Sequence, residues 1–492
     1  MVADRSGTVA TRVDLGVVYS SPQKLAEPVA WRPRRIRSRS AVRSPRSPAS
    51  TSSVSRRAVS GMRTEMMVRR RWFAAVTGMS LLVAGCAMVP ETTLERALPA
   101  GAELAEEREI TTFTASPKAA QEREREFEGF TDNTVRTRMR VSSGGSAVRV
   151  RLDNTFSPDE LHVGRVTIAL ATDREGGINP SSLTELRVER ETSFTLAPGE
   201  SVYTDLARME IPDGADVAVS FYFPGPTGRV TTHSFAGEHS RIATGDHTEN
   251  VNGRPFQVEE KTMSTRPLVG AITVVPETAT GTLVTIGGSM TDGVGVDFSK
   301  GSDRWSDVLS RRIVDEYGPR RLSVANAGMS GNRMLTSSGY GGQRVLERYD
   351  RDVLDLPGAD AVLFAAGIND MQHPPQTTDL DLLMATFEEF ADRTHERGML
   401  FYMATITPFE GWFSWEPHLE ENRQEINRRI RASDKFDGVV DFDAAVRDPD
   451  HPSRILPEWD VHDGIHPNSA GAVELANAVD LDMILGDLNL LD

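Results

Sequence analysis

Cysteine is almost missing from this chain, which has a single one, Cys86, among 492 residues. One cysteine cannot form an intramolecular disulfide, and it cannot supply the thiolates that hold a structural zinc ion. Nucleotide motifs are missing too, because no glycine-rich turn has the G-x-G-x-x-G spacing of a dinucleotide site or the G-K-[ST] of a phosphate loop. We therefore expect no bound cofactor and no metal.

Positive charge is scarce outside the N-terminal end. The chain has 55 Lys and Arg against 71 Asp and Glu, for a net charge of −16, although basic residues outnumber acidic ones over residues 1–71. The remainder is therefore strongly acidic, and we expect it not to bind nucleic acid. A chain of this length predicts two or more domains.

No apolar run in the N-terminal end is long enough to be a comfortable membrane span. Residues 72–83 are mostly apolar, follow three arginines at 69–71 and end at Ala84-Gly85-Cys86, which is the pattern of a secretory signal. The string V-A-G-C resembles a bacterial lipobox, which implies that Cys86 is the lipidated first residue of a lipoprotein. The alternative is a plain signal peptide or short anchor with a chance cysteine. Both predict an exported chain, either lipid-anchored at the cell envelope, on the outer face of the cytoplasmic membrane, or secreted.

The segments around this signal differ in composition. Residues 1–65 are rich in Arg, Ser and Pro without periodicity, and we interpret them as a disordered extension or as the result of a start codon placed too far upstream. Residues 66–86 are the signal with its lipobox. Residues 87–130, rich in Glu and Ala, are expected to be a linker with little packed structure.

Residues 131–278 contain short strand-like runs and no convincing amphipathic helix. Apolar residues alternate with arginine over 135–141 and 148–152, on either side of Gly144-Gly145, which predicts a β-hairpin. Similar short runs recur up to residue 275, so an all-β sandwich is predicted. The arginine stripe is typical of a solvated strand face, with contact to an anionic polymer as the alternative; it consists of Arg136, Arg138, Arg140, Arg149 and Arg151.

Residues 279–492 alternate apolar strand-like runs with helical stretches. The strand-like runs are 283–286, 322–325, 361–366, 400–405 and 439–442, and the clearest helical stretches are 305–317, 380–397, 419–432 and 470–484. Buried strands alternating with helices predict an α/β fold with a doubly wound parallel sheet covered on both faces. Ligand sites in such sheets lie at the carboxyl ends of the strands.

Polar or glycine-rich turns follow those strand ends. The first strand runs into Gly287-Gly288-Ser289, the second into Gly328-Met329-Ser330-Gly331, the third into Gly367-Ile368-Asn369, and the last turn before the terminal helix reads His462-Asp463-Gly464-Ile465-His466. A serine hydroxyl is a weak nucleophile at neutral pH and needs a base such as histidine within hydrogen-bonding reach. Metal binding by the two histidines is disfavoured, because Gly464 and Pro467 oppose a helix and no third ligand is apparent.

These four segments, in this order over residues 281–485, resemble the signature blocks of the SGNH or GDSL hydrolases, serine esterases with a flavodoxin-like fold. The resemblance implies a catalytic triad of Ser289, Asp463 and His466. It also implies an oxyanion hole made by the Ser289 N–H together with Gly331 and Asn369. The family usually has aspartate before the serine; this chain has Gly288, which implies altered local hydrogen bonding rather than lost activity.

The strand-rich region carries a second resemblance. The stretch T-V-R-T-R-M-R-V-S-S-G-G-S at 134–146, and later F-Y-F-P-G-P-T-G at 221–228, resembles the jelly-roll-like accessory domain of xylan-esterase-like SGNH enzymes. That branch implies removal of O-acetyl groups from carbohydrate. Two alternatives stay open: a lipase-like or aryl esterase acting on small lipid esters, and a non-catalytic glycan-binding envelope lipoprotein. Trp412, Trp415 and Trp459 are expected in loops, where they line a sugar or acyl subsite or simply pack.

Overall fold

The computed structural model describes residues 108–257, 264–277, 279–300, 304–318 and 322–491. All of them belong to one compact unit, Ala97–Asp492. The predicted extension, the signal with Cys86 and the linker up to residue 107 lie outside the described residues. Within the described ranges, no helix combines the length and the apolar character that a membrane crossing requires.

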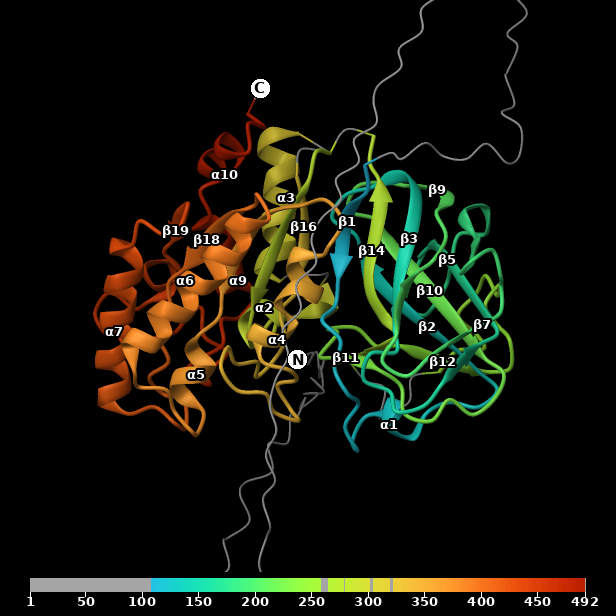
Figure 1. Ribbon diagram of the computed structural model, residues 1–492, viewed down its shortest axis with the longest axis horizontal. Coiled ribbons are helices and arrows are strands. Elements are labelled where there is room, and N and C mark those ends of the chain that lie inside the picture. The colour runs from blue at the N-terminus through green and yellow to red at the C-terminus, as the bar shows by residue number, and fades with distance from the viewer. Residues whose placement is uncertain (1–107, 258–263, 278, 301–303, 319–321, 492) are drawn as a thin grey trace, which may run out of the picture. The chain divides into compact units, whose positions relative to one another are not determined.

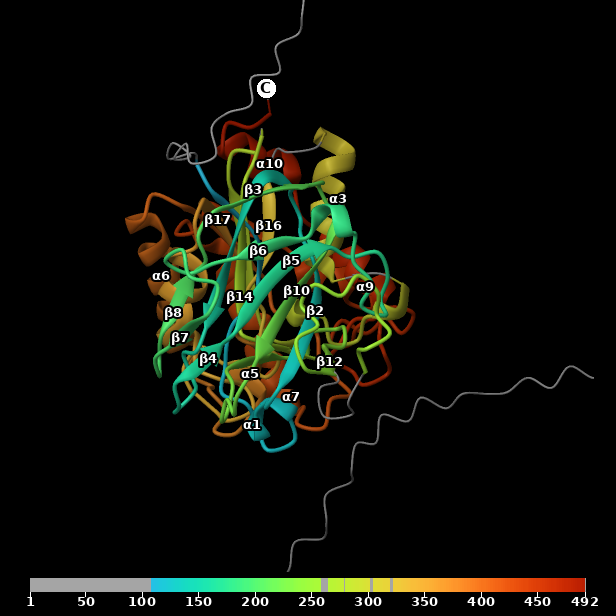
Figure 2. The same ribbon diagram turned by 90° about the vertical axis from the view of Figure 1, so that its right-hand side faces the viewer.

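The strand-rich region contains two five-stranded antiparallel sheets, one of which faces the viewer in Figure 2. The first has the order β1-β14-β3-β8, with β9 also paired to β3. Its strands are β1 (Ile110–Thr114), β14 (Val269–Val275), β3 (Gly145–Asp153), β8 (Ser201–Tyr203) and β9 (Ala207–Ile211). The second has the order β12-β2-β10-β5-β6: β12 (Arg241–Thr244), β2 (Asn133–Arg140), β10 (Asp216–Phe223), β5 (Arg165–Leu170) and β6 (Thr184–Leu186). Two further pairs are β11 (Thr232–Ser234) with β13 (Thr265–Pro267), and β4 (Leu161–Val163) with β7 (Phe194–Leu196).

One apolar core lies between the two large sheets. Val135 and Met139 from β2 and Val148 and Val150 from β3 are all buried in it. Period-two alternation places these side chains on one face of each strand, and burying both faces against each other makes a sandwich. The predicted sandwich is therefore confirmed as an arrangement of layers.

The predicted hairpin between β2 and β3 is wrong. β2 pairs with β10 and β12, whereas β3 pairs with β14, β8 and β9, so the two strands belong to different sheets. A Cβ on Gly144 would lie 1.9 Å from the carbonyl oxygen of Ile211, and one on Gly145 would lie 2.3 Å from that of Val275. The glycines thus allow close approach to other strands rather than a tight turn. Apolar alternation does not distinguish neighbours in one sheet from strands facing each other across a core.

The arginine stripe is not a solvated face either. Arg136 is buried, and its guanidinium donates hydrogen bonds to Ser220 Oγ (2.7 Å) and to the carbonyl oxygens of Gly176 (2.6 Å) and Asn250 (2.9 Å). Arg151 is buried and donates to the carbonyl oxygen of Arg351 (3.1 Å). Backbone carbonyl oxygens accept from both guanidinium groups, and Arg151 also pairs with the Asp153 carboxylate (3.3 Å), which is how a buried cation is tolerated.

Packed structure begins earlier than predicted. The expected linker includes β1, which pairs with β14, and the short helix α1 (Arg125–Glu128). Ile110 in β1 is fully buried. Few of the side chains in residues 87–130 are large and apolar, so the composition of this stretch alone did not indicate burial.

The C-terminal region is built on a parallel sheet with the order β16-β15-β17-β18-β19 (Figure 1). The strands are β15 (Thr282–Gly287), β16 (Ser323–Asn326), β17 (Ala359–Ala365), β18 (Leu400–Ala404) and β19 (Gly438–Val440). Numbered from the first strand of this sheet the order is 2-1-3-4-5, the flavodoxin-like arrangement. The predicted fold class is therefore confirmed.

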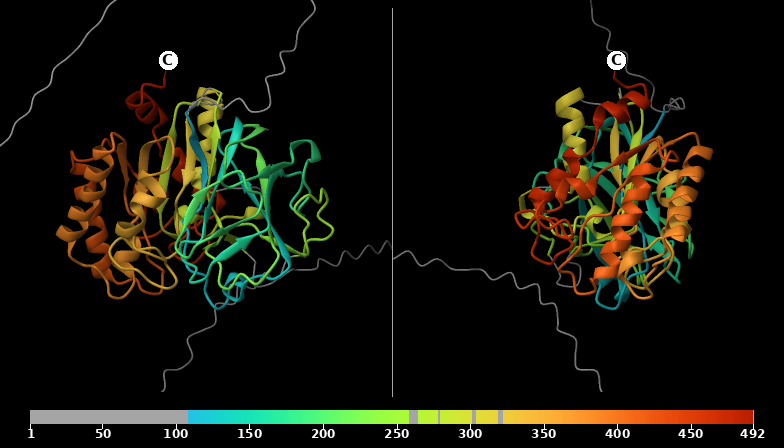
Figure 3. Two further views of the ribbon diagram at one scale, coloured as in Figure 1. Left: turned by 45° about the vertical axis from the view of Figure 1, so that its right-hand side comes forward. Right: turned by 90° about the vertical axis from the view of Figure 1, so that its left-hand side faces the viewer.

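Helices cover both faces of this sheet, as the right panel of Figure 3 shows. One face packs against α4 (Val345–Tyr349), α6 (Leu380–Glu396) and α7 (Pro417–Ala432). The other packs against α3 (Trp305–Tyr317), α8 (Phe442–Val446), α9 (Ser469–Asn477) and α10 (Leu481–Asp487). The last two were predicted as one helix; the chain breaks there because the Asp480 side chain accepts a hydrogen bond from Met483 N and caps a new helix.

Candidate active site

Three neighbouring strands deliver the candidate residues to one edge of the sheet. Ser289 begins the one-turn helix α2 (Ser289–Asp292) directly after β15, Gly331 lies in the loop after β16, and Asn369 lies in α5 (Ile368–Gln372) after β17. β15 lies between β16 and β17, where the strand order reverses. In doubly wound sheets this reversal opens a crevice at the carboxyl ends.

Ser289, His466 and Asp463 form one hydrogen-bonded array. His466 Nε2 lies 2.8 Å from Ser289 Oγ, and His466 Nδ1 lies 2.6 Å from Asp463 Oδ2. His466 is buried, whereas the other two are half-buried. The structure thus brings together the three residues that the sequence predicted, although Ser289 and His466 are 177 positions apart. This arrangement can move a proton from the serine hydroxyl to the histidine ring.

The turn 463–466 fixes the carboxylate that faces the ring. Asp463 Oδ1 accepts hydrogen bonds from the backbone N–H groups of Ile465 (3.0 Å) and His466 (2.9 Å). Burial alone would raise the pKa of the Asp463 carboxyl, but the hydrogen bonds from the His466 ring and from these N–H groups outweigh it and lower that pKa below its ordinary value. Asp463 is therefore ionised at neutral pH.

Three groups that follow β15, β16 and β17 are the candidate donors of an oxyanion hole: the backbone N–H groups of Ser289 and Gly331 and the side-chain amide of Asn369. In the part of the chain that the structure describes, the backbone N–H groups of Ser289 and Gly331 have no hydrogen-bond acceptor. Asn369 Nδ2 donates to the carbonyl oxygen of Asn332 (3.0 Å), and Gln372 Nε2 donates to Asn369 Oδ1 (3.0 Å). The second bond fixes the orientation of the Asn369 amide. Donors held in this way can stabilise a negative oxygen that develops at a reacting carbonyl.

The glycine at position 288, where the family usually has aspartate, has a steric explanation in this chain. A Cβ at this position would lie 2.7 Å from Asn369 Nδ2. Because Asn332 and Gln372 already hold that amide, it has little freedom to withdraw. The missing aspartate therefore leaves room for the Asn369 donor.

Aromatic side chains border the array. Trp412 contacts His466 edge to face at 5.6 Å between ring centroids, and its Nε1 donates to Gln372 Oε1 (2.7 Å). Phe413 beside it is 78% exposed. Of the other two predicted tryptophans, Trp415 packs in the same small cluster and Trp459 packs against the core under α9. Trp412 is thus the one of the three that reaches the histidine.

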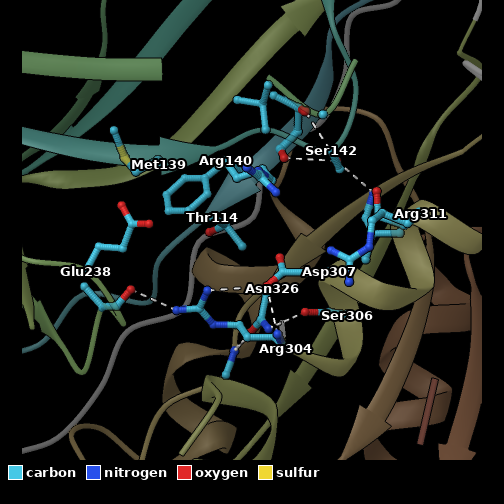
Figure 4. Close-up of a pocket in the computed structure, with 18 of the residues that line it drawn as sticks. Thr114, Met139, Arg140, Ser142, Glu238, Arg304, Ser306, Asp307, Arg311 and Asn326 are labelled. Atoms are coloured by element: carbon cyan, nitrogen blue, oxygen red, sulfur yellow. Dashed lines mark hydrogen bonds and ion pairs between the residues drawn. The ribbon is translucent and has the colours of Figure 1, made fainter. Parts of the chain in front are cut away.

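A cavity of about 290 Å³ lies beside this array rather than at it (Figure 4). It is lined by residues of β1, β2, α3 and β16, and by Asp292 and His233, but not by Ser289, Asp463 or His466. Arg140 and Glu238 from the strand-rich region share its wall with Asp307 of α3 (Figure 4). Since basic and acidic side chains alternate around it, it has no net preference for a ligand of one charge.

Two residues near the array were not predicted from the sequence. Asp292 ends α2 and binds the loop that carries Gly331, and Gln372 orients Asn369. Each stands three positions after a predicted site residue, which is the only hint the sequence offers. As for metals, the described residues include no cluster of three or more His, Cys, Asp or Glu suited to hold an ion.

The model of the GDSL-like Lipase/Acylhydrolase family matches residues 285–473, a range that contains Ser289, Gly331, Asn369, Asp463 and His466. This part of the chain is a GDSL-like acylhydrolase domain. The family hydrolyses ester bonds, so the acylhydrolase domain makes the protein an ester-bond hydrolase. No curated protein matches the chain.

Solved structures similar to this chain include an acetyl xylan esterase from Geobacillus stearothermophilus, at 22% identity and a TM-score of 0.33, covering 43% of this chain and 96% of that one. An α/β hydrolase from the metagenome of Lake Arreo matches at 22% identity and a TM-score of 0.32, covering 44% and 98%. A family two carbohydrate esterase from Cellvibrio japonicus matches at 10% identity and a TM-score of 0.33, covering 79% and 97%.

Proposed function

We propose that the acylhydrolase domain cleaves carboxylic esters through an acyl-enzyme on Ser289. The observation that supports this most strongly is the continuous array from Ser289 Oγ through His466 to Asp463, with contacts of 2.8 and 2.6 Å. Both contacts are within hydrogen-bonding distance before any substrate is bound. These contacts support Ser289 as the nucleophile, His466 as the base and Asp463 as the group that orients the base.

The reaction has two halves. Ser289 Oγ attacks the ester carbonyl carbon while its proton passes to His466 Nε2, and the carbonyl oxygen becomes an anion facing the N–H groups of Ser289 and Gly331 and the Asn369 amide. Collapse of this intermediate breaks the bond to the alcohol oxygen, which takes the proton from His466. Water then attacks the acyl-enzyme with the same histidine as base and releases the acid. Asp463 orients the ring and stabilises its charged form.

We further propose that the substrate is a carbohydrate bearing O-acetyl groups. The support is the resemblance of the strand-rich region to the accessory domain of xylan-esterase-like enzymes, together with aromatic side chains at the site. Phe413 and Tyr340 are both exposed, and a Cβ on Gly331 would lie 2.5 Å from the Tyr340 ring. Flat exposed rings suit the apolar faces of sugars.

Hydrolysis of p-nitrophenyl esters of graded chain length and of acetylated xylan tests both proposals, using residues 87–492 and the variant Ser289→Ala. We expect hydrolysis that the variant loses, with acetyl preferred. A preference for longer acyl chains would favour a lipid ester instead. Activity that survives in Ser289→Ala would contradict the assigned nucleophile, and an inactive but folded wild-type protein would favour the non-catalytic glycan-binding alternative.

Export and lipidation at Cys86 complete the proposal. The support is the sequence alone: three arginines, an apolar run and the V-A-G-C string. Mass spectrometry of protein purified from the envelope should find a diacylglyceryl group on an N-terminal Cys86. Peptides that continue upstream of Cys86 without modification would contradict it.

A further inference from the structure

We propose that His233, in the strand-rich region, is a positioning residue for the oxyanion hole of the acylhydrolase domain. The inference rests on the proposed function, because it assigns a role in the same reaction. It also gives the strand-rich region a part in catalysis in place of a role as a separate binding module.

Two successive contacts, which we call the relay, connect His233 to the residue before Gly331 through Asp292. The first of them lies inside the acylhydrolase domain. Asp292 Oδ2 accepts hydrogen bonds from Ser330 N (2.7 Å) and Ser330 Oγ (2.5 Å). Ser330 directly precedes Gly331, so this carboxylate fixes the residue whose carbonyl carbon is bonded to the Gly331 nitrogen. Bonds of this kind to an ionised carboxylate are short and about twice as strong as neutral ones. Asp292 is buried and stands three residues after Ser289.

The second contact crosses to the strand-rich region. His233 Nε2 lies 3.1 Å from Asp292 Oδ1, and His233 Nδ1 lies 2.9 Å from the carbonyl oxygen of Ser116. His233 belongs to β11 and is 4% exposed. Both ring nitrogens face oxygen atoms, so the ring lies between Asp292 and the strand-rich backbone and, when both nitrogens carry a proton, donates to both.

A parallel set of bonds holds the other end of the same loop. Arg348 Nη1 donates to Ser116 Oγ (2.7 Å) and to the Ala327 carbonyl oxygen (3.0 Å), and Arg348 Nε donates to Asn332 Oδ1 (2.9 Å). Ser116 therefore meets both His233 and Arg348. The loop 327–332 is anchored on each side of Gly331 through one residue of the strand-rich region.

These contacts predict a loss in turnover rather than in substrate binding. With Asp292 no longer held, the Ser330–Gly331 peptide gains freedom, and the Gly331 N–H is misaimed in the transition state more than in the ground state. Loss of an oxyanion donor outright costs about a hundredfold or more, so a loosened donor should cost about tenfold in kcat. KM should stay within about twofold.

A matched pair of variants isolates the contact. His233→Asn retains an amide where Nδ1 meets Ser116 but cannot reach Asp292, whereas His233→Gln retains a donor near the Nε2 position. We expect kcat on p-nitrophenyl acetate to fall about tenfold in the first and to return towards the wild-type value in the second. Thr167→Val removes a buried hydrogen bond to the Thr248 carbonyl oxygen (2.9 Å) elsewhere in the strand-rich region, so it should lower the melting temperature and leave kcat unchanged.

Ser330→Ala tests the relay from its other end, in case His233→Asn does not fold. It removes the Ser330 Oγ bond to Asp292 but leaves the Ser330 N–H bond, so it should reproduce part of the kcat loss, and combining it with His233→Asn should add little, because both loosen the same contact. Equal kcat in His233→Asn and wild type, or an equal loss in Thr167→Val, would overturn the inference.

Hydrogen–deuterium exchange separates this inference from the proposed function. Amides of a peptide spanning residues 327–334 should exchange faster in His233→Asn than in wild type or Thr167→Val, whether or not esters are hydrolysed. If the wild type shows no hydrolysis that depends on Ser289, the proposed function fails while this comparison still reports on the loop. Unchanged exchange in that peptide would overturn the positioning role.

Discussion

At the scale of single residues, the site depends on the orientation of one amide. The Asn369 amide is held between the Asn332 carbonyl oxygen and Gln372. We predict that Asn369→Ala lowers kcat by on the order of a hundredfold, because it removes a preorganised donor to the oxyanion, and leaves KM nearly unchanged. Steady-state kinetics on p-nitrophenyl acetate checks this, with the melting temperature as a control for folding. A change confined to KM would contradict the assignment.

A substitution at Gly288 gives a second test of the Asn369 amide. A methyl group there would meet Asn369 Nδ2 at 2.7 Å and displace it. We predict that Gly288→Ala lowers kcat by about tenfold or more, since small misplacements of reacting groups are costly. A fully active Gly288→Ala protein would show that the donor tolerates a shift. Gly225→Ala, where nothing lies within 4 Å of the added atom and the backbone is not left-handed, serves as a glycine control in the strand-rich region.

The residues of the site differ in how far the sequence could reveal them. Ser289, Gly331, Asn369, Asp463 and His466 stand in four segments that resemble the SGNH signature blocks in their order, and that resemblance is what points to them. His233 lies in a three-residue strand with no local pattern, 59 positions before Asp292. His233 lies near Asp292 only because the strand-rich region packs against the acylhydrolase domain.

At the scale of elements, helix α1 carries a buried carboxyl group. Burial raises the pKa of Glu126 to about 7, even though Thr265 Oγ1 donates a hydrogen bond to it (2.7 Å). The folded state therefore binds this proton more tightly than the unfolded chain does. The resulting stabilisation is fully present below the ordinary carboxyl pKa and is lost as the pH rises through about 7.

Replacing this carboxyl by an amide should remove that pH dependence. We predict that Glu126→Gln has a melting temperature close to that of wild type at acidic pH and a higher one at mildly alkaline pH. The corresponding gain in unfolding free energy at alkaline pH should be on the order of 2 kcal/mol. Thermal unfolding at both pH values measures it, with the exposed neighbour Glu122→Gln as control. An equal effect at both pH values would mean that Glu126 does not take up a proton on folding.

Elements also show where sequence patterns are ambiguous. The parallel strands were predictable because burial on both faces produces continuous apolar runs, as in β17 and β18. The pairing of β2 and β3 was not, because the same alternation serves two strands of one sheet and two strands facing across a core. β1 was not predicted within the expected linker for a related reason, because one buried edge strand needs few large side chains.

At the scale of the whole molecule, the two regions share hydrogen bonds at the start of the parallel sheet. Thr282 Oγ1 donates to the Thr111 carbonyl oxygen (2.8 Å), Thr111 N donates to the Pro357 carbonyl oxygen (2.8 Å), and the hydroxyls of Ser142 and Ser323 lie 2.7 Å apart. Separation would exchange these bonds for bonds to water and expose the surface that is buried around them. The strand-rich region and the acylhydrolase domain should therefore unfold together.

Truncation tests this directly. We predict one cooperative thermal transition for residues 87–492, and for residues 279–492 alone either no cooperative transition or one lower by about 10 °C or more. Circular dichroism against temperature for both chains measures it. A shorter chain that melts at the same temperature as the longer one would show that the regions are energetically independent.

The central claim is that Ser289 is a nucleophile activated by His466. The most direct measurement is peptide mass spectrometry after treatment with a fluorophosphonate, which transfers its phosphonyl group to an activated serine and releases fluoride. We expect one adduct on the peptide that contains Ser289, none in Ser289→Ala, and a much slower reaction in His466→Asn. A folded wild-type protein that remains unlabelled, or that carries its adduct on another residue, would contradict it.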